Sequence, residues 1–115
     1  MKKILVIDDD QDILYVVKYI LTSRGFDVHT HSTSLDVLEV VRSYDPDLIL
    51  LDIRLPWKLG TEICKELKQI YTVPIILISA HGDHQKSFEE SSADAFIIKP
   101  FDINQLVNTI NLQLG

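Results

Sequence analysis

Residues 47–52 read Asp-Leu-Ile-Leu-Leu-Asp, a short run of apolar residues that ends at a single aspartate. The run predicts a strand over Asp47–Leu51 with Asp52 directly after it. Because this strand does not alternate apolar and polar residues, both of its faces should be buried, as in a parallel sheet covered by helices on both sides. The runs Lys3–Ile7 and Pro74–Ile78 have the same character. We expect these three strands at the centre of a parallel sheet.

Two further β-rich runs, Asp27–His31 and Ala95–Ile98, bring the number of predicted strands to five. Segments with helical spacing separate the strands and follow the last one. The predicted helices cover about Gln11–Arg24, Thr33–Ser43, Gly60–Ile70, His84–Ser91 and Asp102–Leu114. Five β-α units of this length predict a doubly wound α/β sheet with right-handed crossovers.

Apolar residues at helical spacing mark one face of four of these helices. The inward residues should be Ile13, Leu14, Val17, Ile20 and Leu21; Leu35, Leu38 and Val41; Ile63, Cys64 and Leu67; and Leu106, Val107 and Ile110. Gly25 is placed to end the first helix, and Asp102 with Gln105 resembles a capping box at the start of the last one.

The segment between residues 81 and 92 has only one large apolar residue, Phe88. A helix here can bury little surface, so neither propensity nor packing strongly favours it. We expect a short helix over about His84–Ser91 that is frayed or variably ordered, which would weaken or alter dimerisation through this region.

Composition and charge limit the classes of function. The 115 residues suffice for one domain, which we expect to span residues 1–115. A net charge of −6 with scattered Lys and Arg argues against nucleic-acid binding by this domain itself. No apolar run approaches the roughly 20 residues that cross a bilayer. The single cysteine, Cys64, suits the reducing cytoplasm, where we expect the protein to reside.

Ligands of doubly wound sheets bind beyond the carboxyl ends of the strands, so the residues at those positions are candidates for a site. They are Asp8, Asp9, Asp52, Ser79 and Lys99. Carboxylates about 5 Å apart repel one another by roughly 3 kcal/mol at an effective dielectric constant near 20. A hard cation with oxygen ligands, such as Mg²⁺, would neutralise them.

Each of these residues also has an ordinary structural interpretation. Asp8, Asp9 and Asp10 precede a helix and could cap it. Asp52 could begin a turn, while serine and lysine at strand ends are usually a loop hydroxyl and a solvated charge. The coincidence of three carboxylates, a hydroxyl and an ammonium group at one edge favours a functional site.

Four segments together resemble the signature blocks of response regulator receiver domains of two-component signalling. They are residues 4–10 (ILVIDDD), 47–56 (DLILLDIRLP) with Gly60 beyond, 74–80 (PIILISA) and 93–101 (ADAFIIKPF). The blocks follow one another in the family's order and cover essentially the whole chain. The resemblance implies a chemotaxis-regulator-like fold, a flavodoxin-like three-layer sandwich with a five-stranded parallel sheet in the order 2-1-3-4-5.

The resemblance also implies a phosphorylation site with a metal ion. Asp52 would accept a phosphoryl group from a sensor histidine kinase or a histidine phosphotransfer protein. Asp9 would bind Mg²⁺ (or Mn²⁺) directly and Asp8 would hold it through water, with Asp52 and the backbone carbonyl of Arg54 as further ligands.

Further implied roles belong to residues around the acceptor. Ser79 would hydrogen-bond one phosphoryl oxygen and Lys99 would pair with another. Phe96 occupies the aromatic switch position, although a core aromatic on a strand would look the same. Arg54 and His81 occupy the positions that modulate the lifetime of the phosphate. The resemblance further implies a cis peptide bond between Lys99 and Pro100.

A protein of this kind would be a signalling switch rather than a dedicated enzyme. It would catalyse its own phosphotransfer and slow dephosphorylation, and phosphorylation would change the surface near the fourth helix, fifth strand and fifth helix. Its partners would be the phosphodonor and a downstream effector or an output domain, and it would be a monomer or a weak phosphorylation-dependent dimer.

Three other functions fit less well. A receiver-like domain that signals without phosphorylation would not need the complete set of site residues. A phosphatase with an aspartyl-phosphate intermediate would usually carry an aspartate two residues after its nucleophile, where this chain has Arg54. A flavin-binding module would need a phosphate-cradling loop after the first strand, where this chain has three aspartates.

The sequence leaves the roles of the histidines and of Trp57 open. His29 with His31, and His81 with His84, have spacings that could suit a metal, but no further ligands are evident. Trp57 could be an exposed partner contact or a lid over the site.

Overall fold

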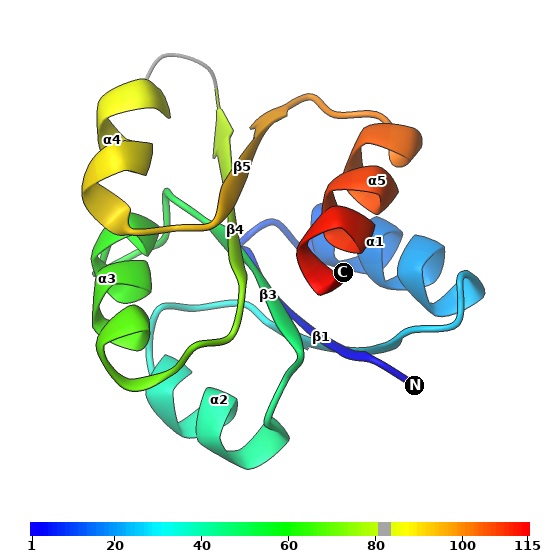
Figure 1. Ribbon diagram of the computed structural model, residues 1–115, viewed down its shortest axis with the longest axis horizontal. Helices are drawn as coiled ribbons and strands as arrows, with labels where there is room; N and C mark the ends of the chain where they lie inside the picture. Colours follow the sequence, from blue (N-terminus) through cyan, green and yellow to red (C-terminus); the bar gives the residue numbers. More distant parts are fainter. Residues whose placement is uncertain (81–83) are drawn as a thin grey trace.

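The computed structural model describes residues 1–80 and 84–115, and the side chains of all of these except residues 84–87. Strands and helices alternate along the whole chain (Figure 1). The elements are β1 (Lys3–Ile7), α1 (Gln11–Ser23), β2 (Asp27–His31), α2 (Val37–Tyr44), β3 (Leu48–Asp52), α3 (Gly60–Ile70), β4 (Ile75–Ala80), α4 (His84–Ser91), β5 (Ala95–Lys99) and α5 (Ile103–Leu114). All neighbouring strands are parallel, and their order, β2-β1-β3-β4-β5, confirms the predicted flavodoxin-like fold.

The sheet separates two layers of helices, with α1 and α5 on one face and α2, α3 and α4 on the other (Figure 1). Successive residues of β1 point into different apolar clusters: Ile4 and Val6 pack with α1 and α5, whereas Leu5 and Ile7 pack with α2 and α3. All four side chains are fully buried. Two-sided burial explains why the central strands are continuously apolar, and a large-to-alanine change in them would cost about 2–5 kcal/mol.

The register of the sheet aligns the carboxyl ends of its strands. Asp52 pairs with Ile78, and Ala80 pairs with Lys99. The strands β3, β4 and β5 run slightly further than predicted, so that Asp52 and Lys99 are the last residues of their strands. The difference arises because backbone pairing with a neighbouring strand, which the local sequence does not reveal, continues to these residues.

Helix α1 has a defined cap at each end. The side chain of Asp10 accepts hydrogen bonds from the backbone N–H groups of Asp12 and Ile13. At the other end Gly25 has a φ of 91°, and its N–H donates to the carbonyl of Thr22. Gly25 therefore ends the helix as predicted, in a left-handed conformation that glycine adopts without strain.

Helix α2 differs from the prediction. It begins at Val37 rather than at Thr33, and the expected core residues Leu35 and Leu38 are 51% and 44% exposed. Val41 is buried as predicted, and Val37, which was not predicted to face the core, is buried as well. The assignment of Leu35 and Leu38 to the core was therefore wrong.

Side chains of the β2–α2 connection explain the later start of α2. The hydroxyl of Ser34 donates to the carbonyl of Pro56, and Asp36 has a φ of 61°. The hydrogen bond and the left-handed backbone conformation hold this segment in a turn. The helix therefore starts later and turns a different set of side chains toward the core.

The other predicted helical faces are confirmed. Cys64 and Leu67 of α3 are buried, as are Leu106 and Ile110 of α5, and α4 has the predicted bounds. The N–H of Gln105 donates to Asp102 Oδ1 over 2.6 Å, which gives α5 its cap. The Lys99–Pro100 peptide bond is cis.

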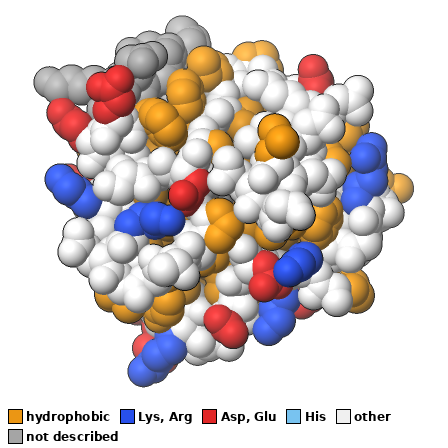
Figure 2. Space-filling model, viewed as in Figure 1, with side chains coloured by type: hydrophobic (Ala, Val, Ile, Leu, Met, Phe, Trp, Pro, Cys, Tyr) orange, Lys and Arg blue, Asp and Glu red, His pale blue; other side chains and the backbone are white. Residues whose placement is uncertain are grey.

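Charged side chains of both signs are interspersed on the face seen in Figure 2 and do not form a large patch of one sign. Within the described part of the chain, no helix has the length and apolar character that crossing a membrane requires.

Candidate functional site

Three carboxylates meet at the carboxyl edge of the sheet. Asp8 follows β1 and is fully buried, Asp52 ends β3 and is 5% exposed, and Asp9 is exposed. One oxygen from each of them lies within 4.8 Å of the others. Among the described side chains, those of residues 1–80 and 88–115, this is the only group of three or more carboxylate, imidazole or thiol side chains close enough together to hold a metal ion.

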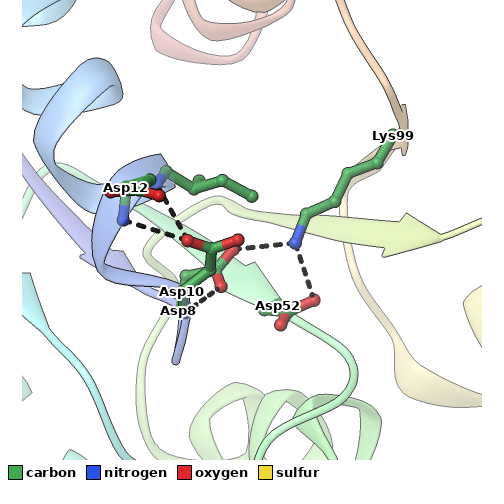
Figure 3. Close-up of polar contacts among 6 residues, drawn as sticks. Asp8, Asp10, Asp12, Asp52 and Lys99 are labelled. Carbon is green, nitrogen blue, oxygen red and sulfur yellow. Dashed lines mark hydrogen bonds and ion pairs between the residues drawn. The ribbon is translucent and has the colours of Figure 1, made fainter.

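Lys99 reaches this cluster from the end of β5 (Figure 3). Its Nζ lies 3.0 Å from Asp8 Oδ2 and 3.6 Å from Asp52 Oδ1. The ammonium group thus lies between the two buried carboxylates, and the sequence prediction that these residues meet is confirmed.

Burial and charge perturb the ionisation of Asp52. Removal from water, followed by the charge of Asp8, raises the pKa of Asp52 from 3.8 to about 6. The ammonium group of Lys99 and the backbone N–H of Arg54 act in the opposite direction but are weaker. The ammonium group of Lys99 therefore does not fully offset the effects of burial and of Asp8 on Asp52.

The pKa of Lys99 is raised although its burial acts to lower it. The hydrogen bond to Asp8 and the charges of Asp52 and Asp8 together outweigh that burial. Lys99 is therefore a stable ammonium group at neutral pH. One ammonium group and three carboxylates carry a formal charge of −2, and oxygen donors with this excess of negative charge suit a hard divalent cation.

Two further predicted site residues flank the cluster. Ser79 is buried near the end of β4, and its hydroxyl donates over 2.6 Å to the carbonyl of Ala80. Its single proton is therefore directed along its own strand and not at Asp52. Arg54 has an exposed side chain, whereas its backbone N–H bonds to the carboxylate of Asp52.

Phe96, at the predicted switch position on β5, is partly buried against the apolar cluster beneath α2 and α3. Its ring centroid lies 5.0 Å from that of Phe88 on α4, with the ring planes at 38°. The ring therefore connects β5 with α4. His81 lies outside the described residues, and its role in phosphate lifetime stays a prediction.

The structure resolves several features that the sequence left open. Among the three aspartates after β1, Asp10 caps α1, which leaves Asp8 and Asp9 to the site. His29 packs against Tyr44 with ring centroids 5.2 Å apart, and His31 Nε2 lies 2.6 Å from the carbonyl oxygen of Leu35. Neither belongs to a described group that could hold a metal.

Trp57 and Gly60 both lie in the region that follows Asp52 in the chain. Trp57 is 78% exposed and does not cover Asp52, so it is not a closed lid. Sequence reasoning missed the contact between Gly60 and the backbone of Asp52, because only the fold brings them together.

Comparisons with known proteins agree with this geometry. The family model described as "Response regulator receiver domain" matches residues 4–111. The BeF₃-activated N-terminal receiver domain of Klebsiella pneumoniae RstA is 28% identical, with a TM-score of 0.92 and 98% of each chain covered. The N-terminal domain of the nisin resistance regulator NsrR is 33% identical, with a TM-score of 0.89 and coverage of 100% of this chain and 99% of that one.

A third similar structure is a CheY-like receiver domain protein from Methanospirillum hungatei JF-1. It is 30% identical, with a TM-score of 0.91, and the alignment covers 99% of this chain and 94% of that one. The fold, the acidic site at the edge of its sheet and the match over residues 4–111 together show that this chain belongs to the response regulator receiver domain family.

Proposed function

We propose that Asp52 accepts a phosphoryl group from a sensor histidine kinase or a histidine phosphotransfer protein, and that residues 1–115 form one receiver domain that acts as the resulting switch. One observation carries the proposal: Asp52 ends the central strand β3 beside Asp8 and within 3.6 Å of the Lys99 ammonium group. A carboxylate next to a fixed cation and a potential metal site is suited to receive an anionic group.

The same cluster would hold Mg²⁺ or Mn²⁺. Asp9 and Asp52 would be direct ligands together with the backbone carbonyl of Arg54, and Asp8 would bind through water. Burial and the charge of Asp8 raise the pKa of Asp52, so a bound cation would stabilise its ionised form, which supports this assignment. When bound, the cation supplies neutralising charge for the carboxylates and the phosphoryl oxygens.

Lys99 and Ser79 would contact the phosphoryl oxygens. Lys99 already lies at Asp52, so it needs little movement to reach an oxygen on the acceptor. The Ser79 hydroxyl would exchange the Ala80 carbonyl for a phosphoryl oxygen, a stronger, charged acceptor. Phe96 would follow this movement and change its packing against Phe88, which alters the surface of α4, β5 and α5.

A groove beside the site supports docking of the phosphodonor. It has a volume of about 650 Å³, lies between α1 and the β5–α5 connection, and includes Lys99 in its wall. Its other lining residues are mainly apolar: Ile13, Val16, Val17, Ile20, Ala80, Pro100, Phe101, Ile103 and Leu106, with Asp12 as a second charged residue. An apolar surface next to the acceptor would bring a partner's phosphohistidine to Asp52.

The switch would report to a downstream effector protein or an output domain. Two of the similar structures are N-terminal domains of regulators, which supports the second arrangement. The domain would work in the cytoplasm without binding nucleic acid or membrane itself, as a monomer or a weak phosphorylation-dependent dimer. Apart from its own phosphotransfer and slow dephosphorylation it would catalyse no reaction.

Intact mass spectrometry tests this function. With Mg²⁺ and a small acyl phosphate donor, the wild-type chain should gain one phosphoryl group, and Asp52→Asn should gain none. Asp45→Asn, which changes an exposed carboxylate outside the cluster, is the matched control and should behave as the wild type. The same gain in Asp52→Asn, or a full gain in excess chelator, would contradict the assignment.

A further inference from the structure

Helix α3 begins in an unusual way. Its N-cap residue, Leu59, makes no side-chain capping bond. Instead the N–H of Gly60, the first residue of the helix, donates over 2.7 Å to the carbonyl of Ile53. A helix N–H that normally needs a cap is therefore used to hold the loop directly after Asp52.

The carbonyl held by Gly60 belongs to the same peptide group as the N–H that holds the acceptor. In a trans peptide the C=O and the following N–H lie in one plane and point in opposite directions. The Ile53 carbonyl points to Gly60, and the Arg54 N–H of this peptide donates to the Asp52 carboxylate. The N–H of Ile53, in the preceding peptide, donates over 3.0 Å to Ile78 on β4. Gly60 thus orients the Ile53–Arg54 peptide group, and the N–H of that peptide group in turn orients the carboxylate of Asp52.

This arrangement requires α3 to approach β3 very closely. A Cβ atom on Gly60 would lie 2.1 Å from the carbonyl oxygen of Asp52 and 2.9 Å from both the carbonyl carbon of Asp52 and the Cα of Ile53. All three are backbone atoms, so no side chain can rotate away to make room. Any other residue here must separate the start of α3 from the end of β3.

We propose that Gly60 is a positioning residue of the phosphoacceptor site, which sets the orientation of the Asp52 carboxylate and of the adjacent metal position through the Ile53–Arg54 peptide. The role rests on the proposed function of Asp52. The start of α3 would then contribute to the chemistry of the site as well as to the fold. Displacement of this peptide should weaken Mg²⁺ binding and slow phosphorylation by roughly tenfold to a hundredfold.

Helix propensity alone predicts the opposite result. Alanine is the better helix former, so Gly60→Ala should favour α3 if the close approach did not matter. A suitable control is Gly25→Ala, because Gly25 precedes β2 at the opposite end of the sheet, with a φ of 91° and open space around it. Both substitutions strain the fold, but only one of them lies at the site.

The experiment compares wild type, Gly60→Ala and Gly25→Ala as full chains. Unfolding in urea gives their stability, titration calorimetry with Mg²⁺ alone gives the metal affinity, and intact mass spectrometry with an acyl phosphate gives the rate at Asp52. We expect Gly60→Ala to lose metal affinity and rate while Gly25→Ala, although destabilised, retains both. Retention of both by Gly60→Ala, or equal losses in the two variants, would overturn the proposal.

Hydrogen exchange without metal separates this inference from the proposed function. In Gly60→Ala the Arg54 amide should exchange faster than in wild type, and an unchanged rate would overturn the role of Gly60 even if wild type is never phosphorylated. If wild type neither binds Mg²⁺ nor gains a phosphoryl group, the function of Asp52 fails separately. If Gly60→Ala does not fold, hydrogen exchange of the wild-type protein tests the contact between Gly60 and Ile53. The Gly60 amide should then be as protected as the core amides of α3. Exchange of this amide at the rate of an open loop would refute the contact.

Discussion

Lys99 Nζ donates a 3.0 Å hydrogen bond to Asp8 Oδ2, although the two residues are 91 positions apart in the chain. Asp8 is fully buried, so the ammonium group is the counter-ion of a carboxylate that has no access to water. Asp52 is slightly further away, at 3.6 Å. In the metal-free protein Lys99 therefore stabilises the buried negative charge that a divalent cation would otherwise neutralise.

The first prediction concerns this ion pair. Lys99→Met should lower the free energy of unfolding in excess chelator by up to about 3 kcal/mol, because it leaves a buried charge unpaired. Mg²⁺ should then restore more stability than it adds to wild type. Urea unfolding with and without Mg²⁺ measures both effects, with Lys18→Met on the exposed face of α1 as control. Equal stability of Lys99→Met and wild type in chelator would show that the pair contributes nothing.

The second prediction concerns pH. The pKa of Asp52 is raised by burial and by Asp8 to about 6 from 3.8, so the folded protein disfavours the ionised form. Without metal, Asp52→Asn should stabilise the fold at pH 7 by an amount on the order of 3 kcal/mol. This gain should shrink as the pH falls through 6 and vanish below about pH 4, where Asp52 is protonated in both states.

Urea unfolding across this pH range in chelator measures the effect. Asp45→Asn is the control, because Asp45 is exposed with a φ of 53°, a conformation that asparagine tolerates equally well. A difference between Asp52→Asn and wild type that does not change with pH would contradict the raised pKa.

The third prediction separates metal binding from helix capping. Asp10 caps α1, and Asp9 is an exposed member of the acidic cluster. Asp9→Asn should weaken Mg²⁺ binding by about tenfold or more, yet leave the metal-free fold as stable as before or more stable. Asp10→Ala should do the reverse, with a loss of about 1 kcal/mol of stability. Calorimetry with Mg²⁺ and urea unfolding in chelator give the two readouts, and a clear loss of stability in Asp9→Asn would make Asp9 structural.

The fourth prediction concerns the lifetime of the phosphate. Arg54 and His81 are bulky residues that should crowd the approach of water to phosphorylated Asp52. The double variant Arg54→Ala with His81→Ala should lose its phosphate faster, by up to about tenfold, or about 1.4 kcal/mol in the barrier. Mass spectrometry of the decay after removal of the donor measures it, with Arg24→Ala as control. A slower decay would show that these side chains orient the attacking water.

The fifth prediction concerns α4. This eight-residue helix is too short to be stable by itself, and its described apolar contact is Phe88 with Phe96. Hydrogen exchange in the unphosphorylated protein should place residues 84–91 among the least protected helical amides, well below Gln11–Ser23. Equal protection of the two helices would show that tertiary packing overrides the weak sequence.

The sequence by itself determined the fold class and the members of the acidic site. Continuous apolar strands such as residues 48–51 have no solvent face, so they require helices on both sides of a parallel sheet. Parallel strands align their carboxyl ends, so residues that end them meet at one edge. Asp8, Asp52 and Lys99 are therefore assigned to one site by the sequence alone.

Only the tertiary structure decided which atoms meet there. The start of α2 depends on a hydrogen bond between Ser34 and Pro56, which are 22 positions apart, and local periodicity therefore placed Leu35 and Leu38 wrongly in the core. The preference of Lys99 for Asp8 arises from packing between separate strands. The contact of Gly60 with the backbone of Asp52 depends on how closely α3 approaches β3, because hydrogen bonds and excluded volume act between segments that have no relationship in sequence.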